Sequence, residues 1–345
     1  MKSFGYDILM KKYQGKKLSY IILSMIIPIE KLEQKGFKIN KSDLSSFLSL
    51  FFNLSVIGSE MYLKEAIDCL VNYFIPSNEE ELDKFFVDFQ IIFPRINSII
   101  ESNIDMLTIK RVSIKERKIN QPTIERKLLQ PTKNSEIISK DLFMIFPLLC
   151  NKLYDSESCF LLYNSSQDGF SFNRLSNCIK YFNSMMIFLI KTNEEGKIIA
   201  VLQDGELFDS AKYNSGTNNN MLIILKPSLK IFKCSSNSSG GNNYAYMNTR
   251  KIENSQLKRG IGFGHDGNIG KARIWLDGEL PDDCTSSPKD DTYDIGKLLT
   301  EYTFKVRDNI AFSHRSMGIW QRGKFGKPSS DERNGEKKSR KSKNG

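Results

Sequence analysis

The spacing of apolar residues changes once along this chain, and that change decides the class of fold that the chain can adopt. From about Tyr20 to Ile100, apolar side chains recur at the period of amphipathic helices. After about Phe160 they alternate with polar residues or form short runs, which is the pattern of β-strands. Because domains commonly contain roughly 100 to 200 residues, a chain of 345 residues has room for two. We predict a helical region over residues 1–108 and an α+β domain over residues 140–315.

Helix boundaries are predicted in the first half from capping residues and prolines. Ser42 and Ser77 precede acidic residues, and a hydroxyl with nearby carboxylates suits the free amides of a first helical turn. The acidic run Glu79–Glu81 is therefore assigned to a first turn, and Pro76 and Pro94 are assigned to helix ends. The calcium-loop pattern Asp-x-Asp-x-Asp-Gly with a later Glu is missing from the sequence. A structural or partner-binding helical region is the expectation.

Seven segments of the second half have the composition and spacing of strands. They are Phe160–Tyr163, Met185–Ile190, Ile198–Leu202, Met221–Leu225, Leu229–Phe232, Ala272–Leu276 and Tyr302–Phe312. Turn residues predict two hairpins, one turning at residues 193–196 and the other at 226–228. One helix is expected from Lys140 to Leu153, and another is expected to open at Ser171. The predicted architecture is a two-layer antiparallel β-sandwich with flanking helices, preceded by an all-α helical region.

Basic residues outnumber acidic ones by 50 to 40, which gives a formal net charge of +10. A linker at residues 109–139 and a tail at 316–345, which is expected to be disordered, carry much of the excess. The candidate docking residues in the linker are Lys115, Arg117, Lys118, Arg126 and Lys127. These stretches either contact acidic protein, RNA or anionic lipid, or only solvate the chain. Electrostatic binding of this kind must weaken steeply as salt rises.

The cysteines and the first residues indicate the compartment. Six cysteines contain no Cys-x-x-Cys pair, which favours a reducing compartment. The apolar run from Leu18 to Ile29 is too short to span a bilayer and is better explained as a core helix than as a signal peptide. Lys2 excludes a myristoylation signal of the Met-Gly type. We expect a cytoplasmic protein without a membrane anchor.

Two patterns that suggest chemistry are rejected from their context. Gly262, Gly264 and Gly267 have the spacing of a dinucleotide-binding loop, but no strand is predicted before them and a strand is predicted after them. His265 and His314 lack metal-ligand spacing. His265 as a general base for a nearby Ser or Cys stays open, although the chain has no Gly-x-Ser-x-Gly elbow. No metal or cofactor is predicted.

The second half nevertheless carries an ordered series of motifs. Residues 161–175 contain a strand, a turn at Asp168-Gly169 and a helix that starts at Ser171. The two predicted hairpins follow, and residues 260–280 contain a glycine-rich loop, with Gly262 and Gly264, and a strand that ends at Asp277. In order and spacing these motifs resemble the TLDc domain family. A helical region ahead of such a domain is similar to the layout of the family's mTOR-associated branch.

The resemblance implies a binding protein that regulates the proton-pumping vacuolar ATPase through its peripheral subunits and protects against oxidative stress. It implies no enzymatic activity, and a location in the cytoplasm, at the cytosolic face of vacuolar or lysosome-like membranes. A monomer is expected, with no DNA as a partner and at most weak contact with anionic membranes. Two alternatives stay open: a thiol- or His265-dependent antioxidant enzyme, and a nucleic-acid or membrane-surface binder that uses the basic stretches.

Two positions depart from the family pattern. Residues Ile310–Phe312 stand where the family usually has a Glu followed by an aromatic residue. Asp290 stands where a Cys is usual. Any acid-assisted chemistry that depended on that Glu is therefore not expected in this chain, whereas a binding role tolerates both changes more easily.

Overall fold

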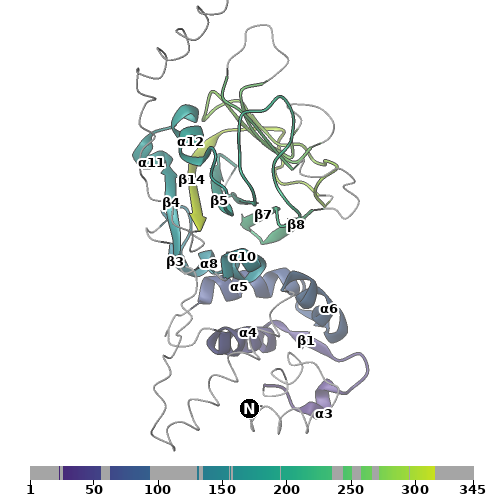
Figure 1. Ribbon diagram of the computed structural model, residues 1–345. Coiled ribbons are helices and arrows are strands. Elements are labelled where there is room, and N and C mark those ends of the chain that lie inside the picture. Colours follow the sequence, from purple (N-terminus) through teal and green to yellow (C-terminus); the bar gives the residue numbers. More distant parts are fainter. Residues whose placement is uncertain are drawn as a thin grey trace, which may run out of the picture. The chain divides into compact units, whose positions relative to one another are not determined.

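The computed structural model of the 345-residue chain is shown in Figure 1. It describes residues 23, 26–55, 63–93, 130–131, 135–154, 156, 158–194, 196–234, 244–250, 258–265, 272–294 and 296–314. All of them belong to one unit, residues 1–315. The five basic residues predicted for docking and the predicted disordered tail lie outside the described residues, and so do the apolar run up to residue 22 and Gly267.

The first half forms helices, with one small addition of β-structure. Its elements are α3 (Ile29–Leu32), β1 (Lys38–Asn40), α4 (Lys41–Ser55), α5 (Lys64–Phe74), β2 (Glu79–Glu81) and α6 (Leu82–Ile92). α5 ends two residues before Pro76, and α6 ends two residues before Pro94. This agrees with the prediction, because the residue before a proline disfavours the helical conformation.

The two predicted helix starts are wrong. A helix capped by Ser42 would begin at Asp43, but α4 begins two residues earlier, at Lys41, and Asn40 Oδ1 accepts the backbone N–H of Asp43 at 2.9 Å. Glu79–Glu81 is a strand that pairs antiparallel with β1, and Lys38 lies opposite Glu81. Opposite charges across a strand pair favour this pairing over a first helical turn.

A single helix predicted from Lys140 to Leu153 is also wrong, because the segment forms three short helices. These are α8 (Lys140–Phe143), α9 (Ile145–Leu149) and α10 (Asn151–Tyr154). Pro147 lies within α9, and its ring lacks an N–H and clashes with the carbonyl of residue 143. Ser139 caps the first of these helices, since its Oγ accepts the N–H of Leu142 at 3.1 Å.

The second half is a two-layer β-sandwich. One sheet has the order β3 (Gln130–Pro131), β4 (Ser158–Asn164), β14 (Val306–His314), β5 (Met186–Thr192), β6 (Ile198–Gln203), β7 (Met221–Lys226) and β8 (Lys230–Lys233). The other has the order β13 (Thr303–Phe304), β12 (Cys284–Thr285), β11 (Ile274–Asp277), β10 (Gly260–Phe263) and β9 (Ala245–Asn248). α11 (Ser165–Asp168) and α12 (Phe172–Ile179) lie between β4 and β5 in the chain. Every described pair is antiparallel except β3 with β4.

This architecture confirms the α+β class and the antiparallel sandwich. Both predicted hairpins form, with Ile190 opposite Ile199 in one and Ile223 opposite Ile231 in the other. The predicted strand over residues 302–312 is divided, because β13 belongs to one sheet and β14 to the other. The strands β9, β10 and β12 were not predicted, since β9 has only four residues and follows a polar stretch, β10 is glycine-rich and β12 has two residues.

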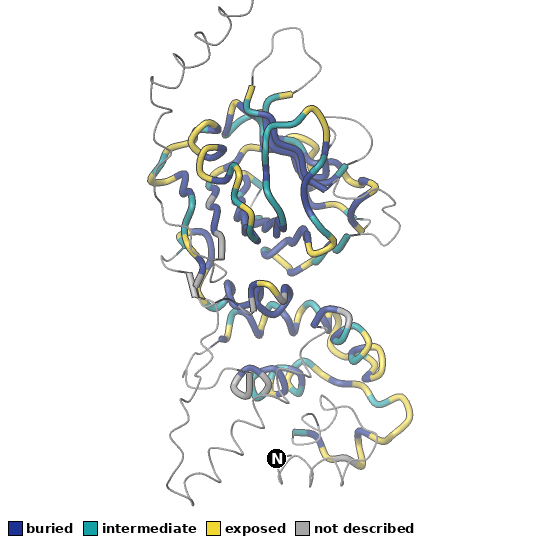
Figure 2. Tube along the Cα trace, viewed as in Figure 1, coloured by how far each residue is buried: buried dark blue, intermediate teal, exposed yellow. Residues whose placement is uncertain are grey.

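The larger sheet is buried on both faces, as the tube in Figure 2 shows for its central strands. Along β5, Met186, Phe188 and Ile190 belong to the core shared with the second sheet. Ile187 and Leu189 alternate with them and belong to a core shared with the helices. Two buried faces explain why these strands read as continuous apolar runs in the sequence.

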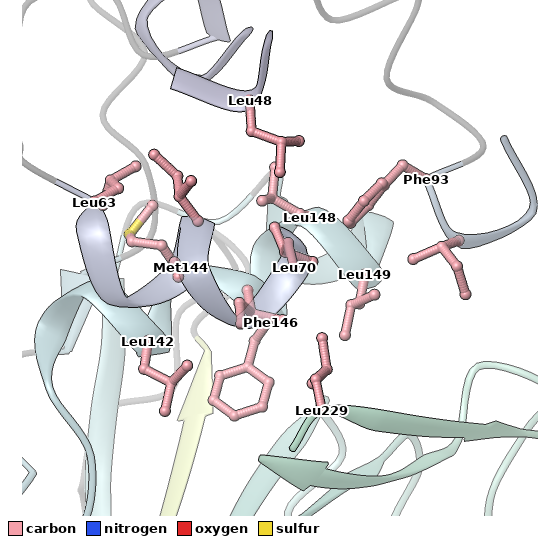
Figure 3. Close-up of a cluster of buried hydrophobic side chains, with 14 of the residues drawn as sticks. Leu48, Leu63, Leu70, Phe93, Leu142, Met144, Phe146, Leu148, Leu149 and Leu229 are labelled. Atoms are coloured by element: carbon pink, nitrogen blue, oxygen red, sulfur yellow. The ribbon is translucent and has the colours of Figure 1, made fainter. Parts of the chain in front are cut away.

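The second of these cores joins the two halves of the chain. Figure 3 shows Leu70 of α5 among side chains of α8 and α9, with Phe146 beside Leu229, the residue before β8. Leu70 and Phe146 are fully buried. The ring of Phe143 lies 5.5 Å from that of Phe312, which is in the inner strand β14. The helical half therefore covers α8 and α9, and these cover the outer face of the sheet.

One carboxylate links the same elements by polar contacts. Glu65 Oε1, on α5, lies 2.7 Å from Lys226 Nζ at the end of β7. The other carboxylate oxygen accepts a hydrogen bond from Ser139 Oγ, the cap of α8. The bond from Lys226 is the main cause that lowers the pKa of Glu65, and the bond from Ser139 adds to it. Glu65 thus joins the helical half, α8 and the sheet at one point.

We expect the stabilisation by Glu65 to depend on pH. Because its folded pKa is below the unfolded value, the contribution is present above the ordinary carboxyl pKa and is lost as the pH falls through the lowered folded pKa. The melting temperature of Glu65→Gln should therefore lie below that of the wild type at pH 7 and approach it as the pH falls below about 4. A difference that is the same at every pH would contradict this account.

Candidate functional site

The first motif, Asp168 to Ser171, forms a tight turn between α11 and α12. Asp168 Oδ2 accepts the N–H of Asn164 at 2.9 Å, and Tyr163 Oη donates to the Gly169 carbonyl at 2.7 Å. Gly169 has φ +74°, a conformation that suits glycine. Ser171 caps α12, since its Oγ accepts the N–H of Arg174 at 3.4 Å. The predicted helix start is confirmed, and these side chains hold the turn.

Arg259 connects this motif to the one that ends at Asp277. Its Nη1 donates to the Gly278 carbonyl at 3.0 Å, and its Nη2 donates to Asn173 Oδ1, on α12, at 2.7 Å. The guanidinium also lies 5.1 Å from the ring centroid of Phe172. Sequence reasoning missed Arg259, because it lies in a polar stretch without a recognisable motif.

Asp277 holds the turn after β11. Its carboxylate accepts Nε1–H of Trp275 at 3.0 Å through Oδ2 and the N–H of Glu279 at 3.0 Å through Oδ1. The side chain fixes a buried tryptophan and its own turn. The structure therefore places Asp168, Gly169, Ser171 and Asp277 in two turns that Arg259 and α12 bring together.

Gly262 and Gly264 lie apart from these turns, and their positions correct the predicted glycine loop. Gly262 is inside strand β10, whose neighbours β9 and β11 are both antiparallel to it. Its backbone is therefore part of a ladder and is not available to a pyrophosphate. Gly264 follows the strand with φ +84°, and a Cβ there would lie 2.6 Å from Cβ of Arg273. Close packing explains both glycines.

Behind Gly264 is a fully buried ion pair. Arg273 Nη1 lies 2.9 Å from Asp290 Oδ2, and both side chains have no exposed surface. Asp290 Oδ1 also accepts the backbone N–H groups of Thr292 and Tyr293 at 2.7 and 2.8 Å. Arg273 is fully buried although it lies between the apolar residues Ala272 and Ile274 of the predicted strand, where alternation would place it on the opposite face from them. Asp290, one of the two departures from the family pattern, is therefore the counter-ion that permits this burial.

Five of the six thiols are in surroundings that disfavour the reactive thiolate, and the sixth, Cys178, is exposed. Burial raises the pKa of Cys69, Cys150 and Cys159, and it raises the pKa of Cys234 and Cys284 to about 12. Because the thiolate is the nucleophile, these groups are poor candidates for thiol chemistry at neutral pH. Cys69 lines a pocket of about 310 Å³ beside Glu65 and Leu229 and is therefore accessible. Its raised pKa still disfavours the thiolate form.

His265 is positioned by its backbone and by an aromatic neighbour. Its N–H donates to Thr292 Oγ1 at 3.2 Å, and its carbonyl accepts the N–H of Asp291 at 2.8 Å. The imidazole centroid lies 4.6 Å from the ring centroid of Tyr213 in an edge arrangement.

Across the described ranges, no group of three or more His, Cys, Asp or Glu residues could hold a metal ion. Within the described part of the chain, no helix is long and apolar enough to cross a membrane.

The fold and these motifs define an α+β protein whose second half is a two-layer antiparallel sandwich held by hydrogen-bonded turns and a buried ion pair. The family model of the TLDc domain matches residues 131–309, which is just over half of the 345-residue chain, and the chain belongs to this family. The resemblance seen in the motifs is thereby confirmed. A comparison with curated proteins gave no match.

Proposed function

We propose that this TLDc-family protein binds the peripheral subunits of the proton-pumping vacuolar ATPase and regulates the pump. The proposal includes a role in protection against oxidative stress, and a place in the cytoplasm, at the cytosolic face of vacuolar or lysosome-like membranes. Family membership supports it, because the resemblance in the motifs implies this role. A rigid sandwich that presents loops is suited to docking on a large assembly.

The observation that carries a binding role is the internal use of the motif side chains. The side chains of Asp168, Ser171 and Asp277 accept hydrogen bonds from backbone groups of their own turns. Gly262 and Gly264 lie where neighbouring atoms leave no room for a side chain. Five of the six thiols have raised pKa values, which argues against an antioxidant enzyme that uses any of these five. The motifs are therefore better explained as parts of a recognition scaffold than as a reaction centre.

Binding to the purified peripheral sector of the pump tests the proposal. We expect saturable binding of the full-length protein to immobilised peripheral sector, and a change in ATP hydrolysis when the protein is added to the assembled pump. A protein that neither binds the sector nor changes hydrolysis would be evidence against a pump regulator.

A variant in which Lys115, Arg117, Lys118, Arg126 and Lys127 are replaced by alanine serves as the matched comparison. If the basic stretch is the docking site, this variant loses affinity, and binding of the wild type weakens steeply with salt. If the sandwich docks, the variant keeps most of its affinity. Binding of the wild type to DNA or RNA in preference to the pump sector would favour the nucleic-acid alternative.

A further inference from the structure

Tyr181, directly after the β-bridge that ends α12, combines an unfavourable backbone conformation with an exposed aromatic ring. Its φ is +62°, and among the described residues only it and Asp283 are non-glycine residues with positive φ. The residue is 61% exposed, the highest value among the exposed large apolar side chains of the described part. A bulky residue in the left-handed region is an outlier, and such residues persist where the surroundings hold them and function uses them.

The backbone at Tyr181 is held from several sides. Its N–H donates to the Leu207 carbonyl at 2.9 Å, and Lys180 forms a β-bridge with the same residue. Lys180 Nζ lies 2.5 Å from Asp209 Oδ2, and Asp209 Oδ1 accepts the N–H of Thr249 at 2.7 Å. These bonds fix the turn through the backbone and through Lys180. The backbone bond and the Lys180–Asp209 pair do not involve the aromatic ring, and the contact of the Tyr181 side chain with Lys180 is additional to them.

The ring lies beside Lys180, and the segments that hold its turn carry two further cations. Lys180 Nζ is 5.0 Å from the ring centroid. Arg250 follows Thr249 directly, and Lys212 is joined to the Asp209 segment by its N–H, which donates to Ser210 Oγ at 3.2 Å. Both Arg250 and Lys212 are exposed. The charge of Asp209 is balanced by Lys180. Glu206 is then the acidic residue left in residues 206–212 to balance the positive charges of Lys212 and Arg250.

We propose that Tyr181 is the anchor of the surface with which this protein docks on a peripheral subunit of the pump. This inference rests on the proposed function. The partner surface is expected to have an apolar hollow that takes the ring. Carboxylates around that hollow would form ion pairs with Arg250 and Lys212. Tyrosine suits this position because interface anchors are enriched in tyrosine and gain from a large, stiff contact area.

Glycine substitution separates the contact from the backbone strain. In Tyr181→Gly the ring is lost and the strain is relieved, since glycine adopts positive φ readily. We expect affinity for the peripheral sector to fall by about 30-fold, as for a central interface tyrosine, while the melting temperature stays level or rises. Tyr181→Phe keeps the ring and should keep most of the affinity. Asp283→Gly relieves the other positive-φ position and serves as the control, with unchanged affinity.

The outcomes discriminate between the two proposals. If the wild type binds the sector and Tyr181→Gly binds equally well, the anchor is wrong and the proposed function stands. If Tyr181→Gly loses affinity together with a lower melting temperature, Tyr181 is structural and the anchor is again wrong. If the wild type does not bind the sector, the proposed function fails and the anchor fails with it. Competition by single-stranded RNA that Tyr181→Gly abolishes would assign the surface to a different class of partner.

Discussion

Replacing Asp290 by alanine lowers the free energy of unfolding by about 3–5 kcal/mol, the range found when one partner of a buried ion pair is removed. Arg273 has no exposed surface, so its guanidinium would remain buried without the carboxylate 2.9 Å away. The same substitution removes the acceptor for the N–H groups of Thr292 and Tyr293. Unfilled donors in a buried site add to the loss. Chemical denaturation followed by circular dichroism measures the change.

Two comparisons show whether the buried charge is the cause. Lys84→Ala breaks an exposed ion pair with Glu80 and should leave the denaturation midpoint unchanged. The double variant Arg273→Met with Asp290→Asn removes both charges and should recover much of the stability that Asp290→Ala loses, because an apolar side chain then fills the site. An Asp290→Ala variant as stable as the wild type would mean that Arg273 finds another partner or reaches water.

The central strands could be predicted from the sequence because their apolar runs are long and bounded by turn residues. Met221–Lys226 and Ile198–Gln203 are examples, and both form within about a residue of the prediction. Strand β10 could not be predicted, because glycine has low strand propensity and its packing against Trp275 depends on the folded partner. Tertiary context also decided β2, whose three glutamates favour a helix start by local rules.

The turns of the candidate site were predictable and their partners were not. Asp168, Gly169 and Ser171 have local roles that a motif reveals, since each acts within a few residues of itself. Arg259 and the Arg273–Asp290 pair join residues far apart in the chain, at separations of 86 and 17 positions. Their roles depend on how the two sheets pack. The spacing of residues in the sequence does not predict which distant residues this packing brings into contact. Tyr181 was missed for a similar reason, because backbone strain appears only in three dimensions.

The burial of both faces of the larger sheet changes how the two halves of the chain are understood. Alternate residues of β5, β6 and β7 contact the second sheet and the helical side, so neither face is left for solvent. Leu142, Met144 and Phe146 are almost fully buried, and Figure 3 shows them among residues of the helical half such as Leu63 and Leu70. The helical half is thus part of the hydrophobic core that the family-matched region needs.

A fragment of residues 131–314, close to the family-matched region, is therefore expected to aggregate or to melt far below the full chain. Removing the helical half exposes several side chains of α8 and α9, each worth about 1.5–3 kcal/mol when buried, against a total stability of roughly 5–15 kcal/mol. Size-exclusion chromatography, thermal denaturation and binding of a hydrophobic dye measure the effect. Deletion of residues 316–345 is the control and should change none of the three, since this segment is a separate unit. A monomeric 131–314 fragment that melts within a few degrees of the full chain would show that α8 and α9 cover the sheet without help, and that the helical half is a separable domain.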